Sequence, residues 1–318
     1  MIEFKILEKT PNETLNNSHY YCDYLELLAL IDCDDGISPS DVYDRFLEDN
    51  KINDIGTDLG AETNEEWMGR IYDWFDEIQS RSIHYGIYYP FDIVNNRIKK
   101  KENVNQQCYL YIILLLCSLL RYIERYHALT TLFERISFIT LQKYLPAVAK
   151  VHVFGVSSSR NERYTGSLEN KYDLLAKDLG LTRSTKPNVF KDGDNGDGGV
   201  DIVAWIPFEG DLNLDRKQIF LGQSATGKNW ASKQASVDRV KNYILDLPSN
   251  SQNILFVPYD FRDARRYFCQ NDELTASIIF DRLRILRLIC IQDVCVGNWE
   301  NIFNEIIEYS LSYQEDII

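Results

Sequence analysis

The stretch from residue 196 to residue 230, GDGGVDIVAWIPFEGDLNLDRKQIFLGQSATGKNW, constrains the fold of this chain more than any other. It predicts two strands joined by a polar segment. The first strand, 200–208, carries Asp201 near its start, and the second, 218–223, ends in a glycine-bounded turn. A carboxylate in an otherwise apolar strand is costly to bury unless it is paired or binds an ion. The stretch therefore predicts a metal site where two neighbouring strands end.

The composition is that of a folded globular protein. The 318 residues suffice for one large domain or two ordinary ones, with 45% apolar and 26% charged residues. A net charge of −14 argues against sequence-independent binding of nucleic acid over a large surface, which needs a basic face. It does not exclude a local basic cleft. Seven cysteines without a CxxC pair indicate buried free thiols rather than disulfides or a zinc site.

No segment predicts export or membrane insertion. The N-terminal sequence lacks the basic-then-apolar pattern of a signal peptide. The most apolar run, 109–120, is shorter than the roughly 20 residues that a membrane helix needs, and it predicts a buried core helix. We expect a cytoplasmic protein with no membrane partner.

Residues 1–150 predict an all-helical N-terminal domain. Helical spacing of apolar residues places helices over 20–31, from Asp41 onward, and over 65–80, 104–126 and 129–145. The segment 82–93 predicts a loop or short extended connector. The basic run 99–101 predicts a solvated turn, with a phosphate contact as the alternative.

Residues 151–318 predict an α/β domain, a mixed sheet flanked by helices. Ser167 and Gly180 cap a helix between them. The remaining predicted elements are strands over 181–190, 200–208, 218–223 and 253–259, and helices over 230–245, 261–292 and 298–312.

Four residues are candidates for metal-assisted phosphodiester hydrolysis, which needs oxygen ligands for a divalent cation and a cation near the phosphate. Asp201 is the strongest, with a strand-start or turn-capping carboxylate as the alternative. Gln223 ends an apolar strand and offers an amide oxygen. Glu169 lies in the first turn of a helix, where the helix dipole alone also favours an acid. Lys228 follows Gln223 past a turn and would otherwise be a solvated loop lysine.

The sequence around these residues resembles the Mrr-like branch of the PD-(D/E)XK nuclease superfamily. The resemblance lies in Leu168-Glu169 with LLAKDLGL, GDGGVDIVAW about 30 residues on, and IFLGQ, and it covers roughly 165–260. It implies a restriction-endonuclease-like core that binds Mg²⁺ or Mn²⁺ through Glu169, Asp201 and Gln223. It also implies DNA as the substrate.

The third motif departs from the family pattern. The lysine expected two positions after Gln223 is Ala225. Lys228 is the first candidate to supply the missing charge, and Lys233 is the second. Glu134, in LFERISF, also matches the phenylalanine–glutamate helix pattern, but its spacing from Asp201 favours Glu169 as the helix acid.

Two functions follow. The first is an Mg²⁺-dependent endodeoxyribonuclease in bacterial restriction or anti-phage defence, whose helical domain binds a protein partner. The sequence leaves open whether this protein forms a homo-oligomer. The second is a catalytically inactive nuclease-fold subunit that serves as a binding or assembly module in a multi-protein complex. A nucleotide-binding loop is disfavoured, because the glycine-rich segment precedes a strand and lacks GK[ST].

Overall fold

The computed structural model describes residues 2–12, 17–32, 36–52, 58–155, 163–190, 196–208, 210, 217–268, 273–275 and 277–316. The chain forms two compact units. The first comprises Met1–Leu129, Pro258–Gln270 and Cys290–Ile318, and the second comprises Thr130–Val257 and Asn271–Ile289. The sequence-based division at residue 150 differs from this arrangement. The second unit takes residues 130–150, while two C-terminal segments join the first unit.

The first unit is built around a buried helix. Its helices are α1 (Ser18–Ile31), α2 (Pro39–Glu48), α3 (Asp58–Tyr85), α4 (Gln106–Ser118), α9 (Ile291–Val294) and α10 (Asn298–Ser312). Every residue of α1 after Ser18 is buried, and α1 packs against α3, α4 and α10. The N-terminus of α2 follows the predicted start signal, since Ser38 and Asp41 form a capping box with Pro39 in the first turn.

Two short strand pairs interrupt the helices of this unit. Strand β1 (Glu3–Phe4) pairs with β4 (Ile123–Glu124), and β2 (Phe91–Val94) pairs with β3 (Arg97–Lys100), both antiparallel. The prediction of an all-helical N-terminal part is therefore wrong. In particular, the basic run begins on strand β3, and α4 ends at Ser118 before a 3₁₀ turn, η2 (Leu120–Tyr122), leads into β4.

The second unit contains a five-stranded mixed sheet, in the order β5-β6-β7-β8-β9. Its strands are β5 (Lys150–Val153), β6 (Ile202–Ile206), β7 (Gln218–Ser224), β8 (Gln252–Phe256) and β9 (Ser277–Phe280). The pairs from β5 to β7 are antiparallel and those from β7 to β9 are parallel. The prediction of a mixed sheet with flanking helices is confirmed.

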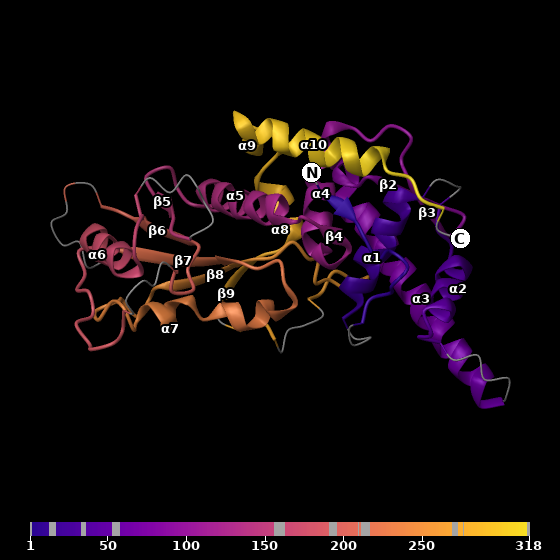
Figure 1. The fold of residues 1–318 in the computed structure, drawn as a ribbon, viewed down its shortest axis with the longest axis horizontal. Coiled ribbons are helices and arrows are strands. Elements are labelled where there is room, and N and C mark those ends of the chain that lie inside the picture. Colours follow the sequence, from indigo (N-terminus) through magenta and orange to yellow (C-terminus); the bar gives the residue numbers. More distant parts are fainter. Residues whose placement is uncertain are drawn as a thin grey trace. The chain divides into compact units, whose positions relative to one another are not determined.

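Helices cover both faces of this sheet. Figure 1 shows α5 (His127–Tyr144) and α7 (Ser236–Val240) on opposite sides of the strands. Helix α6 (Leu168–Leu179) packs with α7 in one apolar core, where Tyr172 and Val240 meet Val203 and Leu221 of the sheet. Ser167 and the left-handed Gly180 cap α6 as predicted.

Three predicted elements of this region differ from the structure. Residues 181–190 form no strand and only an isolated bridge, Arg183 to Ile244; Pro187 in this segment has no N–H to donate to a ladder. The predicted helix 230–245 is a 3₁₀ helix, η3 (Lys228–Gln234), followed by the short α7. Residues 261–292 include β9 and α8 (Arg282–Leu288) instead of one long helix. None of the described helices has the length and apolar character to cross a membrane.

Candidate functional site

The backbone of Asp201 is fixed between β5 and β7. It lies just before β6, and its N–H donates to the carbonyl of Gly222 at 2.9 Å. Its carbonyl accepts from the N–H groups of Phe154 and Gly155, at 2.7 and 3.0 Å. Asp201 therefore occupies a defined position at the end of two neighbouring strand pairs.

The Asp201 carboxylate is held by the end of β7. Its Oδ2 accepts a hydrogen bond from the backbone N–H of Ser224 at 2.7 Å. A Cβ atom at Gly155 would lie 3.2 Å from Oδ1, so glycine there leaves this oxygen room. The buried Oγ of Ser224 has no hydrogen-bond partner in the described structure. One orphaned hydroxyl therefore lies beside the carboxylate, where a further polar ligand would satisfy it.

Several charges converge on Asp201. The pKa of its carboxyl is raised to about 7, chiefly by burial and in smaller part by the carboxylates of Asp197 and Glu134. The Ser224 N–H and the Lys233 ammonium act in the opposite direction. The Asp201 carboxyl is thus subject to the charges of two other acids and one lysine, and a raised carboxyl pKa of this kind is common at functional sites where a cation or a proton balances the charge.

Glu134 and Lys233 reach this region from different elements. Glu134 is half-buried on α5. Lys233 is half-buried in η3, and its ammonium donates to the Ser224 carbonyl at 3.3 Å. The sequence offered both residues only as alternatives, and in the structure the charges of both act on the pKa of Asp201.

Gln223 is paired with an arginine. Its side chain is almost fully buried, and its Oε1 accepts from Nη1 of Arg239 at 2.9 Å. The Nη2 group of Arg239 donates to the Ser232 carbonyl at 2.7 Å. Gln223 therefore anchors α7 to β7, and its amide oxygen is engaged. The sequence alone does not predict this contact, since it depends on how α7 packs.

The glycine-rich turn before Asp201 fits closely against the same arginine. Gly199 has φ +83°, and a Cβ atom there would lie 2.6 Å from Nη1 of Arg239. The Gly199 N–H donates to Oδ1 of Asp197 at 2.7 Å, and Ser236 Oγ donates to the Gly199 carbonyl at 3.1 Å. The GDGG sequence is thus required by backbone conformation and by close packing.

Two predicted site residues are placed elsewhere. Glu169, with about half of its side chain exposed, forms an ion pair with Arg183, which also binds Asp173 at 2.6 Å. Lys228 is exposed at the first residue of η3. The pKa of the Asp201 carboxyl is set chiefly by burial, the Ser224 N–H and Asp197, followed by Glu134 and Lys233, and neither Glu169 nor Lys228 is among these main influences.

The donor set suits a small oxygen-liking cation only in part. Within the described residues, no group of three or more His, Cys, Asp or Glu side chains has metal-binding geometry. Mg²⁺, however, is commonly held by one or two carboxylates together with water and substrate phosphate. Asp201 offers one such carboxylate, Glu134 is the candidate for a second because its charge acts on Asp201, and Gln223 contributes only if its amide leaves Arg239.

No protein-family model matches the chain, and no match was found among curated proteins or solved structures. The functional argument therefore depends on the chain's own residues.

Proposed function

We propose that the second unit is a Mg²⁺- or Mn²⁺-dependent nuclease with a restriction-endonuclease-like core, and that DNA is its substrate. The observation that carries this proposal is the buried Asp201 carboxylate at one end of a mixed sheet, bound by the Ser224 N–H, with Lys233 on the carbonyl of the same Ser224 and with Glu134 of α5 among the charges that act on its pKa. The resemblance of GDGGVDI to the Mrr-like nucleases agrees with it and implies a setting in bacterial restriction or anti-phage defence.

In this proposal the helix acid is Glu134 instead of Glu169. Asp201 and Glu134 supply the carboxylate ligands, and the Ser224 N–H keeps the Asp201 carboxylate in its orientation. A bound divalent cation would lower the pKa of a water molecule and stabilise charge on the scissile phosphate. Lys233 supplies the positive charge that Ala225 cannot provide. The exposed Lys228 is a candidate for contact with the DNA backbone.

A second function is favoured by one specific observation. Ala225, at the position where the family pattern has lysine, is fully buried, and Lys233 already donates to a backbone carbonyl. A nuclease fold with a structural Lys233 would be a binding or assembly subunit without catalytic activity. The strongly acidic net charge of −14 agrees with a protein partner rather than DNA.

Cleavage of supercoiled plasmid DNA in Mg²⁺ or Mn²⁺, with EDTA as the blank, separates the two functions. The nuclease proposal predicts metal-dependent cutting that Asp201→Asn lowers by more than about 100-fold. Mutation of a residue that only supports a metal ligand already costs about 10- to 100-fold in metal affinity or activity, and a ligand itself should matter more. Asp173→Asn, which changes a partly exposed acid of α6 that pairs with Arg183, is the matched control and retains activity. Cutting that survives Asp201→Asn would refute the assignment, and absence of cutting in either metal favours the assembly subunit.

A further inference from the structure

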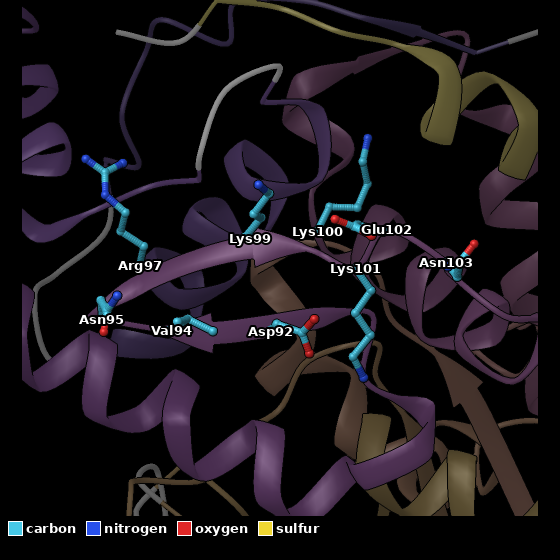
Figure 2. A pocket seen from close by; sticks show the side chains of 9 residues that line it. All are labelled: Asp92, Val94, Asn95, Arg97, Lys99, Lys100, Lys101, Glu102 and Asn103. Carbon is cyan, nitrogen blue, oxygen red and sulfur yellow. The ribbon is translucent and has the colours of Figure 1, made fainter.

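The β2–β3 hairpin of the first unit carries a basic pocket of about 750 Å³ (Figure 2). Four cations and two carboxylates line it, which gives a formal lining charge of 4 − 2 = +2. The cations are Arg97, Lys99, Lys100 and Lys101, and the carboxylates are Asp92 and Glu102. This local excess of positive charge stands out in a chain whose net charge is −14.

The hairpin presents these residues on a fixed frame. Asn95 and Asn96 have φ values of 51° and 61°, as a two-residue type I′ turn requires, and the register pairs Val94 with Arg97. Ile98 points into the core and is fully buried. The alternation of a strand then places Lys100 on the inner side, where it is half-buried.

Backbone carbonyls position two of the lysines without cancelling their charge. The Lys101 ammonium donates to the Tyr89 carbonyl at 2.8 Å, and the Lys100 ammonium lies 3.4 Å from the Leu311 carbonyl. Within the described part of the chain, neither lysine forms an ion pair with a carboxylate. Burial lowers the pKa of Lys100, against the opposing effect of Asp32, so a bound anion would stabilise its charged form.

Arg97 and a helix terminus add to the positive character. Arg97 Nη1 donates to the Gly36 carbonyl at 2.5 Å and lies 3.4 Å from Asp41, which hold the guanidinium in place. Helix α4, of 13 residues, begins at Gln106, shortly after the pocket-lining Asn103. The partial positive charge of a helix N-terminus favours a nearby anion.

We infer that this pocket binds the phosphate groups of a nucleic-acid strand or of a free nucleotide. Lysine and arginine are the side chains that neutralise phosphates, and the amides of Asn95 and Asn103 add hydrogen-bond donors at the rim. The inference is independent of the proposed nuclease site, because all of its residues belong to the first unit.

Fluorescence anisotropy tests the inference with the full chain in EDTA, so that cleavage plays no part. The probes are fluorescein-labelled 20-nucleotide single-stranded and duplex DNA. The variant Lys100→Gln/Lys101→Gln is expected to lower affinity at least tenfold and to reduce the salt slope by about 1–2. The control Lys5→Gln/Lys51→Gln removes the same charge elsewhere in this unit and leaves affinity within twofold. Lys100→Arg/Lys101→Arg retains binding.

Competition identifies the source of the phosphate. Displacement by ATP or tripolyphosphate as effective as by DNA assigns the pocket to a nucleotide, and displacement by DNA alone assigns it to a nucleic-acid strand. Equal affinity of the wild type and the double glutamine variant would overturn the inference. Displacement by polyglutamate as effective as by DNA would also overturn it, as would absence of binding of every probe to the wild type. If the glutamine variant fails to fold by circular dichroism, Lys101→Gln alone gives the same comparison.

Discussion

The Asp201 carboxylate accepts a hydrogen bond from the backbone N–H of Ser224, with Oδ2 and N 2.7 Å apart. This bond joins the start of β6 to the end of β7, so Asp201 is held against the strand that contains Gln223. The buried Ala225 follows Ser224, and its N–H donates to the Phe256 carbonyl at 2.9 Å. The position at which the resemblance to the Mrr-like nucleases expects lysine is therefore part of the sheet's end, and in the proposed site Lys233 of η3 takes the place of that lysine.

The conformation of Gly199 gives a first prediction. Gly199→Ala places a Cβ in the left-handed region and against Arg239, so it should lower the free energy of unfolding by about 1–3 kcal/mol. Gly227→Ala is the matched control, because Gly227 has ordinary backbone angles and open space around it, and its effect should stay within about 0.5 kcal/mol. Urea unfolding measures both. Equal effects would show that the turn tolerates a side chain.

The Gln223–Arg239 contact gives a second prediction. Arg239→Met leaves the buried Gln223 amide without its partner, and Gln223→Leu leaves Arg239 Nη1 without its acceptor, so each should cost about 1–3 kcal/mol. The double variant removes both polar groups and should cost less than the sum of the two single effects, with a coupling of about 0.5–3 kcal/mol. Strictly additive losses in urea unfolding would mean that the hydrogen bond contributes nothing to stability.

Local patterns in the sequence are sufficient to predict much of the second unit. The charged residue at the start of an apolar run identifies Asp201, and the caps at Ser167 and Gly180 delimit α6. The two Asn residues of the β2–β3 turn are also a local signal, since type I′ turns favour Asn, and that signal indicates a hairpin where the sequence was interpreted as a connector over 82–93 and a turn over 99–101.

The partners of Asp201 could not be chosen from the sequence. Glu169 has the expected spacing, yet it lies near Arg183, which engages it on the surface. The charge of Glu134 acts on Asp201 because α5 lies along one side of the sheet, a tertiary relationship that spacing does not encode. The same holds for Lys233, whose approach depends on η3 being a 3₁₀ helix, where a regular helix was predicted.

A buried arginine in the first unit gives a third prediction. Arg81 is fully buried and lies 2.7 Å from Asp23, 3.2 Å from Glu26 and 3.4 Å from Glu77. Arg81→Met leaves these carboxylates without their counter-charge and should destabilise the protein by about 3–5 kcal/mol. Arg125→Met, which removes an exposed ion pair, should cost at most about 1 kcal/mol. Thermal unfolding compares the two, and a similar small loss in both would contradict this role for Arg81.

The pH dependence of stability gives a fourth prediction. The pKa of Glu77 is raised to about 7, chiefly by burial and in smaller part by Asp260, while Arg81 and the hydrogen bonds from Ser18 and Cys22 oppose the shift. Between the ordinary value of 4.5 and about 7, the folded state therefore binds more protons at Glu77 than the unfolded state does. The contribution of Glu77 to the free energy of unfolding falls as pH rises through this window and is level above it.

Glu77→Gln removes this contribution. The free energy of unfolding of Glu77→Gln, minus that of the wild type, should increase by roughly 2–3 kcal/mol from pH 5 to pH 8. Asp201 and His152, whose pKa values are also shifted, affect both proteins equally and cancel in the difference. Urea unfolding at pH 5, 6, 7 and 8 gives the comparison. A difference that does not change with pH would show that Glu77 titrates at its ordinary value.

The most direct test of the proposed site is which helix residue, Glu134 or Glu169, supplies the second carboxylate. Plasmid cleavage in Mn²⁺ is compared for the wild type, Glu134→Gln and Glu169→Gln at equal protein concentration. Asp201 and Glu134 as joint ligands predict that Glu134→Gln loses more than about 100-fold of the wild-type rate, as Asp201→Asn does, while Glu169→Gln stays within about twofold. Full activity in Glu134→Gln together with loss in Glu169→Gln would contradict the proposed site.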